Sequence, residues 1–386
     1  MFYRRYGRTN LKVSVFTFGA MRIPFDEDKL TPLERAERER NAVATIRRAM
    51  ELGINHIDTA RGYGNSERLI GMALKELGRE KFHITTKIQI QPSRDEALRQ
   101  IEQALKKMQI DRIDILDLHG INNLERFKMA TASDGCLAGA LAAQDQGMVG
   151  HLAFSSHAGP DVILRAMETG LFSAMSLHYW WTHPRNAACV HRARELDMGV
   201  LIISPSEKGG LLFKPTPDML RVCDPFAPLT LMHRWLLAGE GVTTLSIGAS
   251  NPEEFSAHLP ALDGNPDTLS LDEIAALERW TMAEAHALGN TRCTLCYKCM
   301  PCPRKVAIPE ILRLRNLGRT FDMIEFGRMR YNLLGQADHW FPGEKADQCN
   351  RCGECLPLCP ERLAIPDLLA DTHQLLAGDD RQRLWK

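Results

Sequence analysis

Eight of the eleven cysteines in the chain lie in two short runs within its last quarter, and a proline directly follows the last cysteine of each run. The second run has the spacing C-x2-C-x2-C-x3-C-P, which is typical of a bacterial-type [4Fe–4S] cluster. The cysteines are Cys293, Cys296, Cys299 and Cys302 in the first run, and Cys349, Cys352, Cys355 and Cys359 in the second. This spacing predicts one-electron chemistry.

A cubane cluster takes one thiolate per iron, and three closely spaced cysteines can hold three of its corners. In two-cluster ferredoxins the fourth ligand is the last cysteine of the other run. This arrangement assigns Cys359 to the cluster of the first run and Cys302 to that of the second. Structural zinc and disulfides are the alternatives. The remaining cysteines, Cys136, Cys189 and Cys223, are scattered and are expected to be buried thiols.

Composition narrows the classes of function. The 386 residues suffice for one large and one small domain. The 48 basic and 48 acidic residues balance, and neither a basic stripe nor a polybasic run indicates binding to nucleic acid or a membrane. The N-terminus has no apolar segment typical of a signal peptide, and no stretch is long and apolar enough to span a bilayer. We therefore expect a cytoplasmic protein, where thiols stay reduced.

Short apolar runs alternate with amphipathic stretches from about residue 15 to 285. Eight β-then-α units in this length predict a (β/α)8 TIM barrel. A doubly wound sheet is the alternative, but no G-x-G-x-x-G follows the first strand. The predicted strands are Val15–Gly19, Asn55–Thr59, His83–Lys87, Ile113–His119, Leu152–Ser155, Ala174–His178, Gly199–Ser204 and Leu245–Gly248.

Helix signals support this division. A capping box at Ser93–Glu96 precedes apolar residues at helical spacing, and the first long helix should end at Gly53. The stretches 270–288 and 309–331 also have helical patterns. We place the boundary between the barrel, residues 1–288, and a small, mostly α-helical ferredoxin-like domain, residues 289–386, just before the first cysteine run.

Four residues able to do chemistry follow successive predicted strands. Asp58 and Lys87 lie at the ends of the second and third strands, His119 ends the fourth, and Tyr63 lies in the loop after Asp58. Each type has an ordinary structural role when alone, such as a helix cap or a buried histidine. Because a barrel collects its active site at the carboxyl ends of its strands, we expect these side chains to meet.

The segment His56–Glu67 resembles the most specific motif of the aldo/keto reductases, and the lysine and histidine positions match as well. The resemblance covers roughly residues 1–285 and implies a (β/α)8 barrel that binds a nicotinamide cofactor across its mouth. It also implies a catalytic tetrad of Asp58, Tyr63, Lys87 and His119. A subgroup of this family carries a C-terminal ferredoxin-like extension, and this chain is similar to that subgroup.

The chemistry of the tetrad agrees with this resemblance. Carbonyl reduction places a hydride on carbon and a proton on oxygen, and Tyr63 is the expected proton donor. Because a free phenol has a pKa of about 10, we expect the Lys87 ammonium to lower it. Asp58 would hold Lys87, and His119 would orient the substrate oxygen.

The resemblance also implies cofactor contacts, for either NADP(H) or NAD(H). Ser155 and Ser156 would contact the carboxamide of the nicotinamide, while Ser204 and the 209–211 segment would lie along the pyrophosphate. Ser176 stands where many family members have glutamine, and the cations that often grip the 2′-phosphate of NADPH are missing from 246–254. The full predicted set is Gly19, Met21, Arg22, Ser155, Ser156, Ser176, Ser204, Gly209, Gly210, Leu211, Gly248, Ser250, Asn251 and Glu254.

Two classes of function remain open at this point, together with the possibility that the clusters are purely structural. The first is an oxidoreductase that transfers hydride between nicotinamide and a small carbonyl or alcohol, with two [4Fe–4S] clusters for electron transfer. The second is an electron-transfer or redox-sensing protein whose barrel serves as a docking or redox module. Clusters pass single electrons whereas nicotinamide passes pairs, so the link between them is open. A ferredoxin-like electron partner is compatible with both.

Overall fold

The computed structural model describes residues 1–336 and 338–378. These residues group into two compact units, each built from several stretches of chain. Unit 1 comprises Met1–Tyr179, Asn186–Pro205 and Leu236–Thr268. Unit 2 comprises Trp180–Arg185, Ser206–Trp235 and the described residues from Leu269 onward. The sequence-based domain boundary at residue 288 stays a prediction, because each of these units groups residues that are close in space rather than continuous in sequence.

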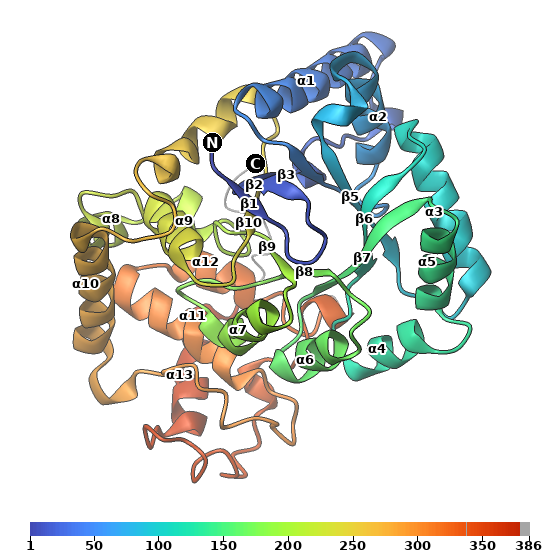
Figure 1. Cartoon of the computed structure of the whole chain (residues 1–386). Helices are drawn as coiled ribbons and strands as arrows, with labels where there is room; N and C mark the ends of the chain where they lie inside the picture. Colours follow the sequence, from blue (N-terminus) through green and yellow to red (C-terminus); the bar gives the residue numbers. More distant parts are fainter. Residues whose placement is uncertain (337, 379–386) are drawn as a thin grey trace. The chain divides into compact units, whose positions relative to one another are not determined.

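Unit 1 contains a closed barrel of eight parallel strands, in the order β10-β3-β4-β5-β6-β7-β8-β9. The expected (β/α)8 barrel is thereby confirmed, and helices surround the central strands (Figure 1). The strands are β3 (Phe16–Gly19), β4 (His56–Asp58), β5 (His83–Gln89), β6 (Ile113–His119), β7 (Val149–Ser156), β8 (Ala174–Leu177), β9 (Gly199–Ile202) and β10 (Thr244–Ile247).

An N-terminal hairpin precedes the barrel. Its strands, β1 (Tyr3–Arg5) and β2 (Lys12–Ser14), pair antiparallel. Tyr6, in the turn between them, is buried in a cluster with residues of four barrel strands, among them Ile115 and Leu201. The hairpin therefore adds side chains to the interior of the barrel.

Two helices of unit 1 end or begin where the sequence predicts: α1 stops at Gly53 and α3 starts after Ser93. Thr31 caps α1 with a complete capping box, and the chain leaves this helix through Gly53, whose φ of 84° suits glycine. At α3, Ser93 accepts a hydrogen bond from the Glu96 amide, which is half of the expected box. The helices are α1 (Pro32–Glu51), α2 (Ser66–Leu77), α3 (Arg94–Met108), α4 (Leu124–Thr131), α5 (Cys136–Asp145), α6 (Pro160–Glu168) and α7 (Ala187–Glu195).

Helices dominate the remainder of the chain. The stretch 309–331, expected to be helical, forms two helices, because Asp322 adopts a left-handed φ of 52° and interrupts the run. These are α11 (Ile308–Phe321) and α12 (Ile324–Tyr331). The others are α8 (Pro217–Cys223), α9 (Pro228–Ala238), α10 (Leu271–Leu288) and α13 (Ile365–Leu376).

The two cysteine runs have matching backbone conformations. In each run the residues two and four places after the first cysteine have positive φ: Leu295 and Tyr297 in one, Arg351 and Gly353 in the other. A helix then starts six residues after the last cysteine, and both helices begin with Ile-Pro after an alanine N-cap. Alternating left-handed residues turn successive amides toward one side, which suits an anionic iron–sulfur cluster.

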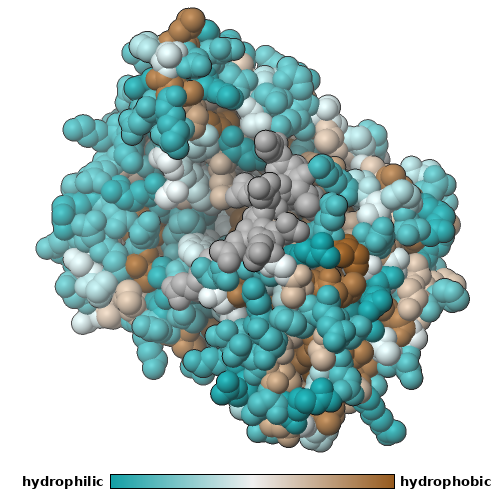
Figure 2. Space-filling view, turned by 180° about the vertical axis from the view of Figure 1, so that it is seen from behind, coloured by the Kyte–Doolittle hydropathy of each residue, from teal (hydrophilic) through white to brown (hydrophobic). Residues whose placement is uncertain are grey.

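The face of the molecule in Figure 2 is mostly hydrophilic, with hydrophobic residues in small separate areas. No helix in residues 1–336 and 338–378 is long and apolar enough to cross a membrane.

Candidate functional site

The four predicted catalytic residues lie at the carboxyl ends of three neighbouring strands and in one adjoining loop. Asp58 is the last residue of β4 and His119 the last of β6, while Lys87 lies near the end of β5, which pairs with both. Tyr63 follows β4 and precedes α2. The parallel register therefore brings together residues that are up to 61 positions apart in sequence (from 58 to 119).

The Lys87 ammonium forms a buried ion pair with the Asp58 carboxylate. The two side chains are 1% and 4% exposed, so water screens this pair little. Lys87 Nζ also donates a hydrogen bond to the Thr59 carbonyl oxygen at 2.8 Å. The same nitrogen lies 5.3 Å from the centre of the Tyr63 ring. The ammonium is thereby fixed beside the phenol.

Tyr63 and His119 face each other edge to face. Their ring centres are 5.9 Å apart and their planes meet at 84°. Both side chains are only partly buried, unlike Asp58 and Lys87. A group that donates a proton or hydrogen bond to a substrate must be reachable, and these two are.

The pKa of Tyr63 is raised above its ordinary value, which corrects the expectation that it would be lowered. Burial is the largest cause, and the nearby Asp58 and Asp117 carboxylates add to it, outweighing the Lys87 ammonium. Burial pulls the pKa of Lys87 down, but Asp58, Tyr63 and Asp117 together leave it raised. At neutral pH the pair is thus a protonated phenol beside a charged ammonium, which suits a proton donor.

Asp117 is a further buried carboxylate that sequence reasoning did not single out. It lies two residues before His119 on β6, is 1% exposed, and accepts a hydrogen bond from Ser176 Oγ at 3.0 Å. Burial raises its pKa to about 7, against the opposing effect of Lys87. Side chains two apart on a strand share a face, so a charged residue at this otherwise apolar interior position was the available signal.

The two serines predicted to contact the carboxamide, Ser155 and Ser156, are buried, and their hydroxyl groups form hydrogen bonds within the protein. Ser155 Oγ accepts a hydrogen bond from the Gly120 amide at 3.0 Å, and Ser156 Oγ donates to the Ile121 carbonyl at 2.6 Å. Both bonds fix the loop that follows His119. Together with Ser176, which binds Asp117, these serines are held in place by the barrel.

A second group of predicted cofactor residues gathers around Glu254. Its carboxylate pairs with Arg22 at 3.0 Å and accepts a hydrogen bond from Ser250 Oγ at 2.7 Å. Asn251 caps the following turn, and a side chain at Gly248 would press on Arg22 at 3.1 Å. Gly19 pairs with Asp58 in register. Met21 lies nearby in sequence and is exposed.

The predicted pyrophosphate residues divide between the units. Ser204 belongs to unit 1, has a φ of 52° and is exposed, whereas Gly209, Gly210 and Leu211 belong to unit 2. Both glycines have positive φ, 98° and 74°, so the chain turns here as few other residues would allow.

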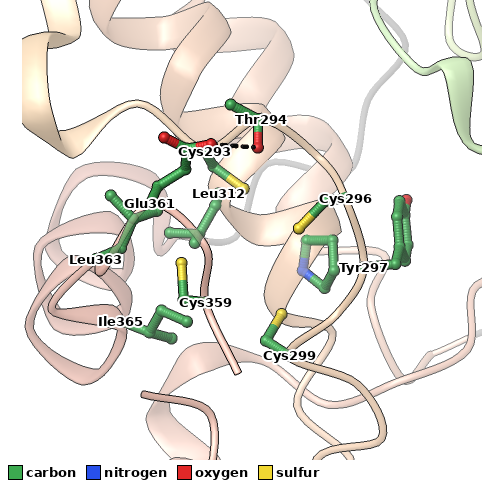
Figure 3. A pocket seen from close by; sticks show the side chains of 11 residues that line it. Cys293, Thr294, Cys296, Tyr297, Cys299, Leu312, Cys359, Glu361, Leu363 and Ile365 are labelled. Atoms are coloured by element: carbon green, nitrogen blue, oxygen red, sulfur yellow. Dashed lines mark hydrogen bonds between the residues drawn. The ribbon is translucent and has the colours of Figure 1, made fainter. Parts of the chain in front are cut away.

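The eight clustered cysteines line two hollows of unit 2, in the combination expected for crossed ligation. Cys293, Cys296, Cys299 and Cys359 line the first, of about 320 Å³. Their side chains turn toward one common space (Figure 3). Cys302, Cys349, Cys352 and Cys355 line the second, of about 510 Å³, to which Cys299 also contributes. Four thiols around each space fit the donor set of a [4Fe–4S] cluster.

The three other cysteines, Cys136, Cys189 and Cys223, are buried thiols, as predicted. Burial raises the pKa of Cys223 to about 12 and also raises that of Cys136. Within the described residues, no three His, Cys, Asp or Glu side chains are arranged to hold a single metal ion.

Two families of known proteins match this chain. The family model "Aldo/keto reductase family" matches residues 17–226, which is more than half of the chain. The chain belongs to the aldo/keto reductase family. A second model, "4Fe-4S dicluster domain", matches residues 292–364 and supports iron–sulfur clusters over structural zinc. The resemblance stated from the sequence is thereby confirmed for both parts.

Relatives within the family are distant. A probable aldo-keto reductase 1 from Glycine max is 28% identical over 53% of this chain and 59% of its own length. L-galactose dehydrogenase from Arabidopsis thaliana is 35% identical over 31% of this chain. Only 38% of that relative is covered, so the chain spans less than two thirds of the length of each of these two relatives.

Methylglyoxal reductase DkgB from Salmonella typhi is 25% identical over 61% of this chain and 87% of its own length. Among solved structures, the holo form of aldo-keto reductase AKR11C1 from Bacillus halodurans has a TM-score of 0.60 at 23% identity. It covers 72% of this chain and 96% of its own, which supports the shared barrel fold.

Proposed function

We propose that this protein is a nicotinamide-dependent oxidoreductase that transfers hydride between NADPH or NADH and a small carbonyl or alcohol substrate. The observation that carries this proposal is the buried Asp58–Lys87 pair beside the reachable side chains of Tyr63 and His119. The nicotinamide, when bound, supplies or accepts the hydride. Protein side chains donate the proton and orient the substrate oxygen.

In carbonyl reduction, Tyr63 gives its hydroxyl proton to the substrate oxygen as negative charge develops there. His119 donates a hydrogen bond to the same oxygen and orients it, so that two donors stabilise the charge. Lys87 then stabilises the phenolate left on Tyr63, and Asp58 keeps Lys87 in place and charged. Lys87 opposes the burial that raises the pKa of Tyr63, and so eases release of this proton to the substrate oxygen.

The nicotinamide contacts carried over from the family are the serines after β6 to β8, the residues around Glu254, and the 209–211 segment. The Glu254 carboxylate, which occupies Arg22, disfavours the 2′-phosphate of NADPH. Both cofactors therefore belong in the tests below.

The cysteines of unit 2 hold two [4Fe–4S] clusters in this proposal. Cys293, Cys296, Cys299 and Cys359 ligate one, and Cys302, Cys349, Cys352 and Cys355 the other. Cys296 and Cys352 are exposed, so an electron partner such as a ferredoxin-like protein can approach one ligand of each cluster. Cluster assembly needs reduced thiols, and a cytoplasmic location is proposed on that ground.

An anaerobic experiment tests the proposal. The purified, iron-quantified protein is mixed with NADPH or NADH, first alone and then with small aldehydes and ketones. Oxidation of the nicotinamide that depends on the carbonyl compound supports the reductase. Bleaching of the visible cluster absorption by nicotinamide alone supports electron transfer between the centres. Nicotinamide binding that cannot be detected would overturn the reductase and favour a redox-sensing protein.

A further inference from the structure

The segment Ser206–Phe213 follows β9 and includes the glycines proposed to bind pyrophosphate; it is called the cofactor loop below. It belongs to unit 2, together with all the described cysteine-run residues. Three consecutive residues of this loop contact helices or segments that follow the first cysteine run. Its conformation is therefore tied to the unit that carries the cysteines.

Glu207 makes the most demanding of these contacts. Its side chain is fully buried, and its φ of 67° is one that residues other than glycine adopt at an energetic cost. The Arg313 guanidinium on α11 lies 3.2 Å from its carboxylate and is itself 2% exposed. A buried carboxylate needs such a cation, and among the positive charges that act on Glu207, Arg313 has the largest effect.

The next two residues pack against α12 and the segment after it. Lys208 Nζ donates a hydrogen bond to the Trp340 carbonyl at 3.3 Å and lies 4.3 Å from the centre of the Phe341 ring. At Gly209, a side chain would meet Arg330 at 3.0 Å, so the loop backbone lies directly on this helix. The loop has little freedom as long as α11 and α12 stay in place.

Helix α11 in turn forms part of the wall around the cysteines. Its residues Pro309 and Leu312 line the first hollow, and Ile308 lines the second. Asn316 Nδ2 donates a hydrogen bond to the Cys293 carbonyl at 2.9 Å. Ligation of the eight cysteines would therefore fix the helix that carries Arg313.

A second connection runs through Glu310, one turn before Arg313 on the same helix. Glu310 pairs with Arg313 at 2.9 Å and lies 3.8 Å from His183 Nε2. His183, in the segment after β8, is hydrogen-bonded at 2.5 Å to the hydroxyl of Tyr297, which lies between Cys296 and Cys299. One polar chain thus joins the first cysteine run to the cofactor loop.

We propose that the Glu207–Arg313 ion pair makes nicotinamide binding depend on iron–sulfur loading. With the clusters in place, α11 holds the cofactor loop in the conformation that accepts the nicotinamide cofactor; without them the loop loses that conformation. This inference rests on the proposed function, because only the family resemblance places the loop at the pyrophosphate. Glu207 and Arg313 are positioning residues and need not touch the cofactor.

The test compares wild type, Glu207→Gln and the control Arg319→Gln, each with clusters and after anaerobic removal of iron. Arg319 lies on the same helix, but its ion pair with Asp371 is at the surface. Dissociation constants for NADPH and NADH, iron content and amide hydrogen exchange of residues 206–213 are measured. Arg313→Lys keeps the positive charge on a shorter side chain, and it is a second variant in case Glu207→Gln folds poorly.

With clusters, Glu207→Gln should bind nicotinamide at least tenfold more weakly than wild type, with unchanged iron content and faster exchange in the loop. Arg313→Lys should show a smaller loss in the same direction, and Arg319→Gln a change below twofold. Iron removal should weaken nicotinamide binding at least tenfold in wild type. In Glu207→Gln, whose binding is already weak, iron removal should weaken it less than twofold further. Equal losses in both backgrounds, or wild-type affinity in Glu207→Gln, would overturn the inference.

A wild-type protein that carries clusters but binds no nicotinamide would refute the proposed function instead. Hydrogen exchange then decides the coupling by itself. Protection of residues 206–213 that is lost both on iron removal and in Glu207→Gln supports it, and protection that survives both contradicts it.

Discussion

Asp58 and Lys87 form a buried ion pair between neighbouring strands β4 and β5, and Lys87 has a second anchor in the Thr59 carbonyl. Removing one partner of such a pair leaves an uncompensated buried charge. We expect Lys87→Met to lower the free energy of unfolding by about 3–5 kcal/mol. The double variant Asp58→Asn/Lys87→Met should lose less than the sum of the two single losses.

Chemical denaturation measures these differences. Lys81→Met is the control, because Lys81 pairs with Glu80 at the exposed surface and such pairs contribute about 0–1 kcal/mol. Strictly additive losses would mean that Asp58 and Lys87 do not stabilise each other.

Tyr63→Phe should lower kcat for carbonyl reduction about 10²–10⁴-fold, because it removes the proton donor. The dissociation constant of the nicotinamide should change little, since the ring and its contacts remain. Steady-state kinetics and a binding titration check both quantities. Tyr3→Phe, which loses only an exposed hydrogen bond to the Gly53 carbonyl, is the matched control. Turnover retained by Tyr63→Phe would refute the assignment.

Asp117 should make the stability of the fold depend on pH. Its folded-state pKa of about 7 lies above the ordinary 3.8, so the folded state holds a proton that the unfolded state has released. The stabilisation from that proton is complete below pH 3.8 and is lost as the pH rises through about 7. Asp117→Asn carries no titrating group and should gain stability relative to wild type over this range.

The gain should be on the order of 1–4 kcal/mol between the two ends of the range. Thermal unfolding at several pH values measures it. The surface variant Asp111→Asn should show no such trend, and a constant difference between Asp117→Asn and wild type would contradict the prediction.

Crossed ligation predicts which pairs of cysteine substitutions are redundant. Cys293→Ala and Cys359→Ala should each remove the same cluster, so the double variant should lose no more iron than either single variant. Cys293→Ala combined with Cys302→Ala should damage both clusters and lose about four further irons. Iron quantitation and visible absorption give the answer, with Cys189→Ala as the control. Loss of both clusters in Cys293→Ala/Cys359→Ala would argue for ligation within each run.

Glu254→Gln should shift cofactor preference toward NADPH. It removes a negative charge and releases Arg22 from a 3.0 Å ion pair, so that the guanidinium can bind a phosphate. We expect the ratio of the NADH to the NADPH dissociation constant to rise roughly 3–10-fold. The neighbouring, exposed Glu253→Gln should leave it unchanged. An unchanged ratio in Glu254→Gln would place this carboxylate away from the adenosine end.

The strands of the barrel were predictable because each is a short apolar run between helical patterns, and all eight were found. The interruption at Asp322 was not, because aspartate in a left-handed conformation has no signature in the hydrophobic period. That the four side chains of the tetrad lie close together was predictable, because all follow the ends of neighbouring strands. The direction of the pKa shift of Tyr63 was not predictable, because burial and two carboxylates raise the pKa while one ammonium lowers it.

Asp117 shows why sequence patterns alone do not identify every residue of the site. Its place two residues before His119 marked it as an interior side chain, but its partner Ser176 is 59 residues away and was assigned to the cofactor. The contacts between the cofactor loop and α11 were beyond sequence reasoning as well. They join residues more than 100 positions apart, such as Glu207 and Arg313.

The interleaving of the two units has a consequence for synthesis of the chain. The polypeptide passes from one unit to the other at residues 179, 185, 205, 235 and 268. A ribosome adds about 5–20 residues per second, so the segments 180–185 and 206–235 emerge well before the helices they pack with. A nascent chain that ended near residue 268 would lack α10, which holds the segment 206–235 through the Arg234–Glu273 ion pair, and all the helices after it. Such a truncated product should be a substrate for chaperones rather than a free-standing barrel.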